Sequence, residues 1–195
     1  NAASVQTVTG TIAEVQPVIA LGGKVTSFGA VAYTLSDPGS VAAVDLTDIA
    51  ATTSGLVSEV AVTELTGTIA QAQASFDATN IALDGNETVV ISDTTGVTAA
   101  ALNALDQATT GAINAATIQT ISGTLDGLNT AYASTEIAGL NAFPAAPTVP
   151  DTGPVAAADL NTLNAAANGL VNAASVTELT GSFAAVQAAF DANDA

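Results

Sequence analysis

Asn1-Ala-Ala-Ser-Val-Gln-Thr-Val-Thr-Gly10 is a segment whose pattern returns three times along this 195-residue chain. The other copies are Ser58-Glu-Val-Ala-Val-Thr-Glu-Leu-Thr-Gly67, Asn114-Ala-Ala-Thr-Ile-Gln-Thr-Ile-Ser-Gly123 and Asn172-Ala-Ala-Ser-Val-Thr-Glu-Leu-Thr-Gly181. The period is roughly 56 to 58 residues, a length typical of repeat proteins, in which each unit buries its apolar face against its neighbours. We therefore expect one elongated repeat domain over 1–195, with units near 1–57, 58–113 and 114–171 and a partial unit over 172–195.

The first half of each unit predicts a short strand followed by a helix. The expected strands are Val5–Val8, Val62–Leu65, Ile118–Ile121 and Val176–Leu179. In the second copy, Ile69, Ala72 and Phe76 follow at the i, i+3, i+7 spacing of one helix face. Thr11, Thr68, Thr124 and Ser182 occupy the expected N-cap positions, and Glu14 and Gln71 stand where they complete a capping box.

The second half of each unit predicts another strand and another helix. The strands are expected at Val31–Asp37, Thr88–Asp93 and Ala146–Asp151, the last made irregular by two prolines. The helices are expected at Val41–Ile49, Val97–Leu105 and Val155–Leu163, ending near Gly55, Gly111 and Gly169 as C′ residues.

These elements predict an α/β repeat fold, a solenoid-like stack of β-α-β-α units that repeats with the period given above. Equivalent strands of successive units are expected to lie side by side in parallel, with the helices outside. The alternative is an all-α repeat, because short apolar runs do not distinguish strand from helix by periodicity alone.

Composition restricts the function. The chain has 18 acidic residues and one basic residue, Lys24, so its net charge is −17. Nucleic-acid binding requires clustered Lys and Arg, and membrane insertion requires about 20 consecutive apolar residues, so neither is expected. His and Cys are absent, which removes the familiar nucleophilic triads and thiolate metal sites. We expect no enzymatic activity, and we expect copies of the same chain as the main partner, with glycans as a further possibility.

Two groups of residues are candidate sites. Asp37, Asp93 and Asp151 recur at equivalent strand-to-helix turns, so they are candidate calcium ligands, and no other cofactor is expected. The other interpretation is that each aspartate caps the helix that follows it. Lys24 and Phe28 lie where the first copy departs from the repeat pattern, and we expect an interface contact there.

Three segments carry a resemblance to a known class of protein: Asp93–Leu105, Thr109–Ala115 and Ile118–Tyr132. They resemble Ala/Thr/Val-rich repeats of large secreted bacterial surface or adhesin-like proteins, of the cyanobacterial and proteobacterial kind. The resemblance implies a secreted, cell-surface location. The function expected is an extracellular structural protein that assembles into a filament, sheath or surface layer. The alternative is an adhesin-type binding module, stiffened by calcium, that contacts glycans or another surface.

Overall fold

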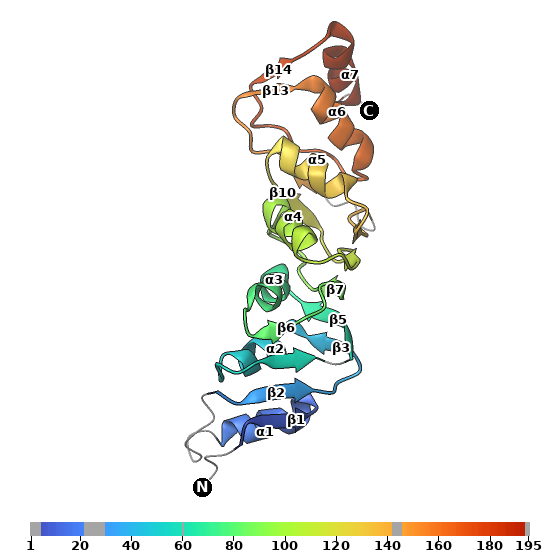
Figure 1. The fold of residues 1–195 in the computed structure, drawn as a ribbon. Coiled ribbons are helices and arrows are strands. Elements are labelled where there is room, and N and C mark those ends of the chain that lie inside the picture. The colour runs from blue at the N-terminus through green and yellow to red at the C-terminus, as the bar shows by residue number, and fades with distance from the viewer. Residues whose placement is uncertain (1–4, 22–29, 60, 142–145, 194–195) are drawn as a thin grey trace. The chain divides into compact units, whose positions relative to one another are not determined.

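The computed structural model describes residues 5–21, 30–59, 61–141 and 146–193. Among these residues, seven helices alternate with short β-strands along the chain (Figure 1). The chain divides into two compact units. The first comprises Asn1–Val90 and Ala108–Ala112, and the second comprises Ile91–Gln107 and Ile113–Ala195.

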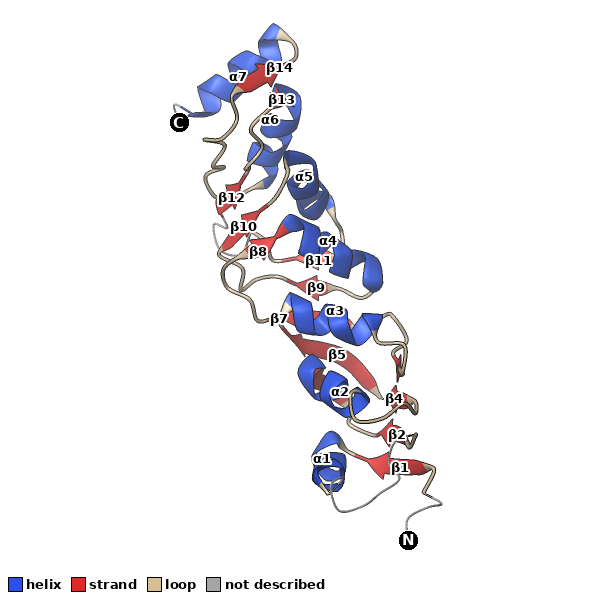
Figure 2. Cartoon of the chain, turned by 90° about the vertical axis from the view of Figure 1, so that its left-hand side faces the viewer, coloured by secondary structure: helices blue, strands red, loops and turns tan. Residues whose placement is uncertain are grey.

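The first unit contains two sets of parallel strands. One is a four-stranded sheet in the order β1 (Thr7–Gly10), β2 (Ala32–Leu35), β4 (Val57–Glu59) and β6 (Ile81–Ala82). The other set contains β3 (Gly39–Ala42), β5 (Val62–Gly67) and β7 (Thr88–Ile91). Figure 2 shows helices α1 (Ile12–Ala20), α2 (Ala43–Ala50) and α3 (Ile69–Asp77) following one another on the side of this unit opposite β1, β2 and β4.

The second unit repeats the same kinds of element. Its parallel pairs join β8 (Val97–Thr98), β10 (Thr120–Ser122) and β12 (Ala146–Thr148), then β9 (Ile113–Asn114) and β11 (Ile137–Ala138), then β13 (Pro154–Ala156) and β14 (Glu178–Thr180). Its helices are α4 (Ala99–Ala108), α5 (Leu125–Ala133), α6 (Ala157–Ala166) and α7 (Phe183–Asn193). The predicted α/β class with parallel strands is therefore confirmed, and the all-α alternative is wrong.

The pairing partners of the strands differ from the prediction. Val57 pairs with Ile81 across α3, and Val97 pairs with Ile121 across α4, so the partners lie less than half a period apart. The first predicted strand of a unit likewise pairs with the next predicted strand along the chain, as β1 does with β2 and β10 with β12. The expectation that equivalent strands, one full period apart, pair with one another is wrong for these strands. One short helical crossover is enough to bring two strands together in parallel, so the nearer strands pair first.

The second helix of each unit begins two residues later than predicted. Val41, Val97 and Val155 lie in strands, where they pair with Leu65, Ile121 and Leu179. A β-branched valine loses side-chain freedom in a helix and packs well on a pleated strand, which explains why the helix starts after it.

The predicted N-cap positions Thr11, Thr68 and Thr124 are confirmed. At Thr11 the amide donates to Glu14 Oε2 over 2.9 Å, but the hydroxyl makes no capping hydrogen bond. Thr68 and Gln71 form a reciprocal capping box: the Gln71 amide donates to Thr68 Oγ1 over 3.2 Å, and the Thr68 amide donates to Gln71 Oε1 over 2.9 Å. The hydroxyls of Thr124 and Ser182 accept in the same way from the amides of Gly127 and Ala185. Each bond satisfies an amide that the helix itself leaves unpaired.

Gly55 and Gly111 serve a different purpose from the one predicted. Helix α2 ends at Ala50, so Gly55 is not its C′ residue. A Cβ atom at Gly55 would collide with the backbone oxygen of Val31, and one at Gly111 would collide with that of Glu87. The hydroxyls of Thr53 and Thr109 donate to these two oxygens over 2.6 and 3.0 Å. The Thr-x-Gly sequence therefore binds the chain to the residue just before an earlier strand, β2 or β7, at a separation that only glycine permits.

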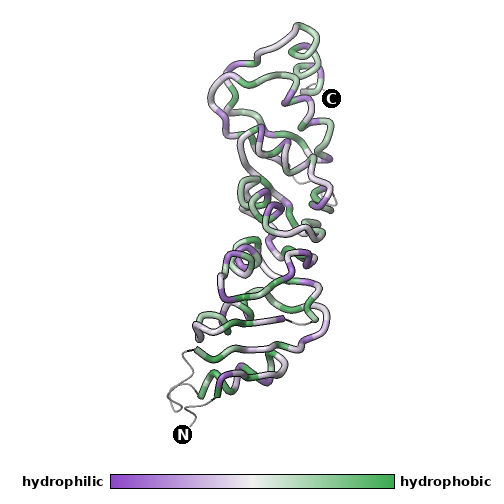
Figure 3. The backbone as a smooth tube through the Cα atoms, viewed as in Figure 1, coloured by the Kyte–Doolittle hydropathy of each residue, from purple (hydrophilic) through white to green (hydrophobic). Residues whose placement is uncertain are grey.

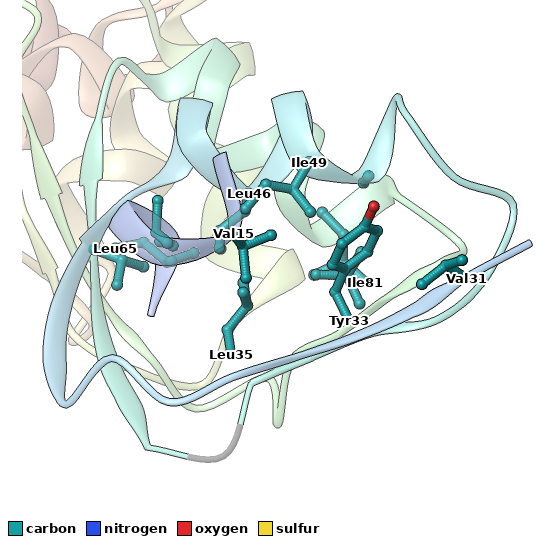
Figure 4. Close-up of a cluster of buried hydrophobic side chains, with 12 residues drawn as sticks. Val15, Val31, Tyr33, Leu35, Leu46, Ile49, Leu65 and Ile81 are labelled. Atoms are coloured by element: carbon teal, nitrogen blue, oxygen red, sulfur yellow. The ribbon is translucent and has the colours of Figure 1, made fainter. Parts of the chain in front are cut away.

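Small aliphatic side chains fill the cores of both units. In the first unit the buried cluster joins residues from several strands and helices, among them Val15, Tyr33, Leu46, Leu65 and Ile81 (Figure 4). Apolar segments recur between polar ones along the described part of the chain, as Figure 3 shows. Many short helices and strands therefore each contribute a few side chains to the core.

Candidate functional site

Two of the three candidate aspartates bind the start of a helix. Asp37 Oδ2 accepts from the amide of Ile12 over 2.7 Å, and Asp151 Oδ2 accepts from the amide of Leu125 over 3.0 Å. Ile12 and Leu125 are the first residues of α1 and α5. A carboxylate at this position pairs an unsatisfied amide and suits the positive end of the helix dipole. The capping interpretation holds for these two residues, but the helix served is an earlier one in the chain and not the one that follows.

The three aspartates are distributed over both units. Asp37 belongs to the first unit, whereas Asp93 and Asp151 belong to the second. Across the described ranges, no group of three or more Asp or Glu side chains is placed to hold a metal ion. Calcium binding stays a prediction, and it would have to compete with the helix contacts of Asp37 and Asp151.

The predicted interface residues, Lys24 and Phe28, lie outside the described residues. Their proposed contact stays a prediction.

A pair of buried glutamates in the first unit was not predicted. Both carboxylate oxygens of Glu59 are inaccessible to solvent and have no hydrogen-bond partner within the described chain, although the side chain as a whole is half-buried. Glu87 is only 2% exposed; its Oε1 accepts from the Asp84 amide over 2.6 Å, and its Oε2 has no partner among the described residues. Burial, followed by repulsion from Asp37 and Glu87, raises the pKa of Glu59 to about 7.

The repeat itself contained a signal for this pair. Glu59 stands where the third and fourth copies have Ala115 and Ala173, and Glu87 stands where the first copy has Val31. Ala115 and Val31 are almost fully buried. The second copy therefore carries two carboxyl groups at positions that are apolar core elsewhere, and aligning the copies would have found both.

Helix α7 and the segment before it expose three large apolar side chains, and the position of one of them is buried in every earlier copy. Phe183 begins α7 and is 83% exposed, whereas its counterparts Ile12, Ile69 and Leu125 are 8%, 6% and 6% exposed. Phe190, further along the same helix, is 61% exposed, and Leu170 is 89% exposed. We call Leu170, Phe183 and Phe190 the C-terminal apolar surface. The helix position of Phe183 is therefore buried in three copies and exposed in the last one that the structure describes.

A groove of about 400 Å³ adjoins this surface, between α6, α7 and the segment that joins them. We call it the α6–α7 groove; its lining is Leu160, Asn161, Asn164, Leu170, Val171, Asn172, Ala173, Ala174, Ala189 and Ala192. Leu160, Val171 and Ala189 are partly exposed, whereas Leu102, Ile113 and Ala131, their counterparts in the preceding copy, are 0%, 0% and 1% exposed. The groove therefore occupies a place that is filled in the preceding copy.

None of the helices in the described part of the chain has both the length and the apolar character needed to cross a membrane. Comparison with known proteins found no matching family model, no matching curated protein and no matching solved structure.

Proposed function

We propose that this chain is an extracellular structural protein that self-assembles, through its C-terminal apolar surface, into a filament, sheath or surface layer. In this proposal the chain is a solenoid-like stack in which each turn buries the apolar face of the turn before it. The parallel pairings between strands less than half a period apart, such as Val57 with Ile81 and Ile121 with Pro147, support such a stack.

The observation that carries the proposal is the exposure of Phe183. The same helix position is buried in three earlier copies, whereas Phe183 is 83% exposed. Phe183 and Phe190 lie seven residues apart on one helix, and an exposed apolar surface of this kind is typical of a site that a protein partner covers. A second copy of the chain that covers these side chains would remove their exposed apolar area from water.

The test compares the chain with the double variant Phe183→Ser/Phe190→Ser by sedimentation velocity and electron microscopy, each with calcium and with a chelator. Burying one phenylalanine contributes about 2 kcal/mol, so the variant should need at least roughly 100-fold more protein to assemble. The matched control is Val44→Ser/Leu56→Ser, which removes two exposed apolar side chains of the first unit and should assemble as the parent does.

The outcomes separate the alternatives. A parent chain that stays monomeric in every condition would contradict the proposal and favour the adhesin-type module. Assembly that requires calcium would instead make Asp37, Asp93 and Asp151 the site to study.

A further inference from the structure

We infer that the end of strand β4 is a pH-sensitive switch: protonated Glu59 packs into the core of the first unit, whereas ionised Glu59 leaves the core for water and separates the end of β4 from β2. Three acidic residues form the switch, Asp37, Glu59 and Glu87, and all of them belong to the first unit. The switch does not involve the C-terminal apolar surface, so it is independent of the proposed self-assembly.

The place of Glu59 in the sheet directs its side chain towards the core. Glu59 is the last residue of β4, where it pairs with Leu35 of β2. Side chains two residues apart on a strand lie on the same face, so Glu59 shares the face of Val57. Val57 and Leu35 are 0% and 1% exposed. The carboxyl group of Glu59 therefore enters an apolar layer, and both of its oxygens are inaccessible to solvent.

The charged groups that act on this carboxyl group are acidic. They are Asp37, two residues beyond the end of β2, and Glu87, immediately before β7. The Asp84 amide donates to Glu87 Oε1, but Glu87 Oε2 and both oxygens of Glu59 have no partner among the described residues. Burial of an unpaired negative charge is costly, whereas a protonated carboxyl group carries no charge. A proton is therefore the ligand that keeps Glu59 in the core.

The later copies have no acid here and form a turn that is bound to itself. In the third copy Ala115 stands in place of Glu59; the Ile118 amide donates to Ala115 O over 3.1 Å, and Asn114 Oδ1 accepts from the amide two residues further on over 3.1 Å. The fourth copy repeats both bonds, over 3.0 and 3.2 Å. The second copy has Ser58 in place of the asparagine, and its hydroxyl donates to a backbone oxygen of β2 over 3.4 Å. The end of β4 therefore depends on its neighbours in the sheet.

The backbone next to Glu59 is irregular, which favours local opening. Beyond Glu59 the Gly39 amide donates to Ala61 O over 3.0 Å. The register between β3 and β5 shifts between Gly39 and Ser40. A shift of this kind interrupts the regular ladder of hydrogen bonds, and such places open at a lower cost than helices or regular sheets. The Gly39 amide therefore reports whether the end of β4 is closed.

The test is hydrogen exchange of the ¹⁵N-labelled chain, followed amide by amide by NMR from about pH 5 to about pH 8. A chelator is present throughout, because Asp37 is also a candidate calcium ligand. The closed state binds the proton of Glu59 more tightly than the open state, so opening becomes easier as the pH rises from the ordinary pKa of 4.5 to the folded pKa of about 7. We expect the protection factor of the Gly39 amide to fall at least about tenfold. The Ile118 amide, bound to Ala115, should keep its protection factor within about twofold.

Two variants remove the ionisable group of the switch. Glu59→Gln keeps the shape of the side chain, and Glu59→Ala introduces the residue of the third and fourth copies. Both should make the protection factor of the Gly39 amide independent of pH. The matched control is Glu178→Ala, which removes the same charge from an exposed position of β14 and should respond to pH as the parent does.

Three results would overturn the inference. The first is a protection factor of the Gly39 amide that stays constant over the pH range, and the second is an unchanged pH response in Glu59→Gln. The third is an equal fall at the Ala72 amide of α3, which donates to Thr68 O over 2.9 Å, because the first unit would then open as a whole and not at the end of β4.

Discussion

Glu59 is the residue whose ionisation should change the stability of the first unit. Its folded-state pKa of about 7 exceeds the ordinary value of 4.5, so the folded state holds its proton more tightly than the unfolded state. The ionised form therefore destabilises the fold above pH 7, and this penalty disappears as the pH falls from 7 towards 4.5. A carboxyl group in an apolar core thus makes this unit more stable in mild acid.

The variant Glu59→Gln should remove this dependence. The shift sets an upper bound of about 3 kcal/mol, and because the side chain is only half-buried we expect about 1 to 2 kcal/mol. The variant should be more stable than the parent at pH 8 and equal to it at pH 4.5, as measured by urea denaturation. The difference between the two proteins isolates the contribution of Glu59, because both proteins contain Asp37 and Glu87. A constant difference across the pH range would contradict the assignment.

At the scale of elements, the repeat predicted most helices and the longer strands. Thr68 with Gln71, and the i, i+3, i+7 pattern after it, located α3 from local chemistry alone. The strands β6 and β11 were missed because two residues carry no periodicity, and they are defined only by their partners Val57 and Ile113. The pairing register was wrong because sequence similarity identifies equivalent segments, whereas pairing depends on which segments one crossover brings together.

The sequence likewise predicted only part of the candidate site. Asp37 and Asp151 were recognised as N-terminal carboxylates, but their partners Ile12 and Leu125 depend on which segments pack together in the fold. The C-terminal apolar surface was not predicted from the sequence. Its residues can be identified only from their exposure in the folded chain, because a phenylalanine at position 183 suits a buried position as well as Leu125 does.

The close backbone contact at each Thr-x-Gly segment leads to a prediction about stability. Gly55→Ala places a methyl group against the Val31 backbone, so the segment must move and the Thr53 bond must lengthen. We expect a loss of about 1 to 3 kcal/mol in the free energy of unfolding, as for other overpacked core positions. The control is Gly153→Ala, where the added methyl group meets no atom within 4 Å. Equal stabilities of the two variants in thermal denaturation would show that the close approach at Gly55 is not required.

At the scale of the whole molecule, charge opposes association. A net charge of −17 on every copy makes two copies repel each other at low ionic strength. The screening length falls to about 10 Å in roughly 0.1 M salt, whereas burial of Phe183 and Phe190 does not weaken with salt. Raising sodium chloride from roughly 10 to 300 mM should therefore increase the sedimenting fraction, and a potassium chloride series, matched in ionic strength, should follow the same curve. Assembly that decreases with salt would indicate contacts made by ion pairs.

The pairing register also decides which hydroxyl groups form an ordered row. Thr9 and Thr66 are equivalent in the repeat, yet Thr9 lies beside Thr34 and Thr66 lies beside Ala42, in different sheets. Neighbouring hydroxyl groups instead come from two strands that pair directly, such as those of Thr34 and Ser58, whose hydroxyl oxygens are 3.4 Å from each other. A crystal lattice of ice or cellulose, which is matched by evenly spaced identical side chains, would meet a mixed row here, because equivalent residues of the repeat lie in different sheets.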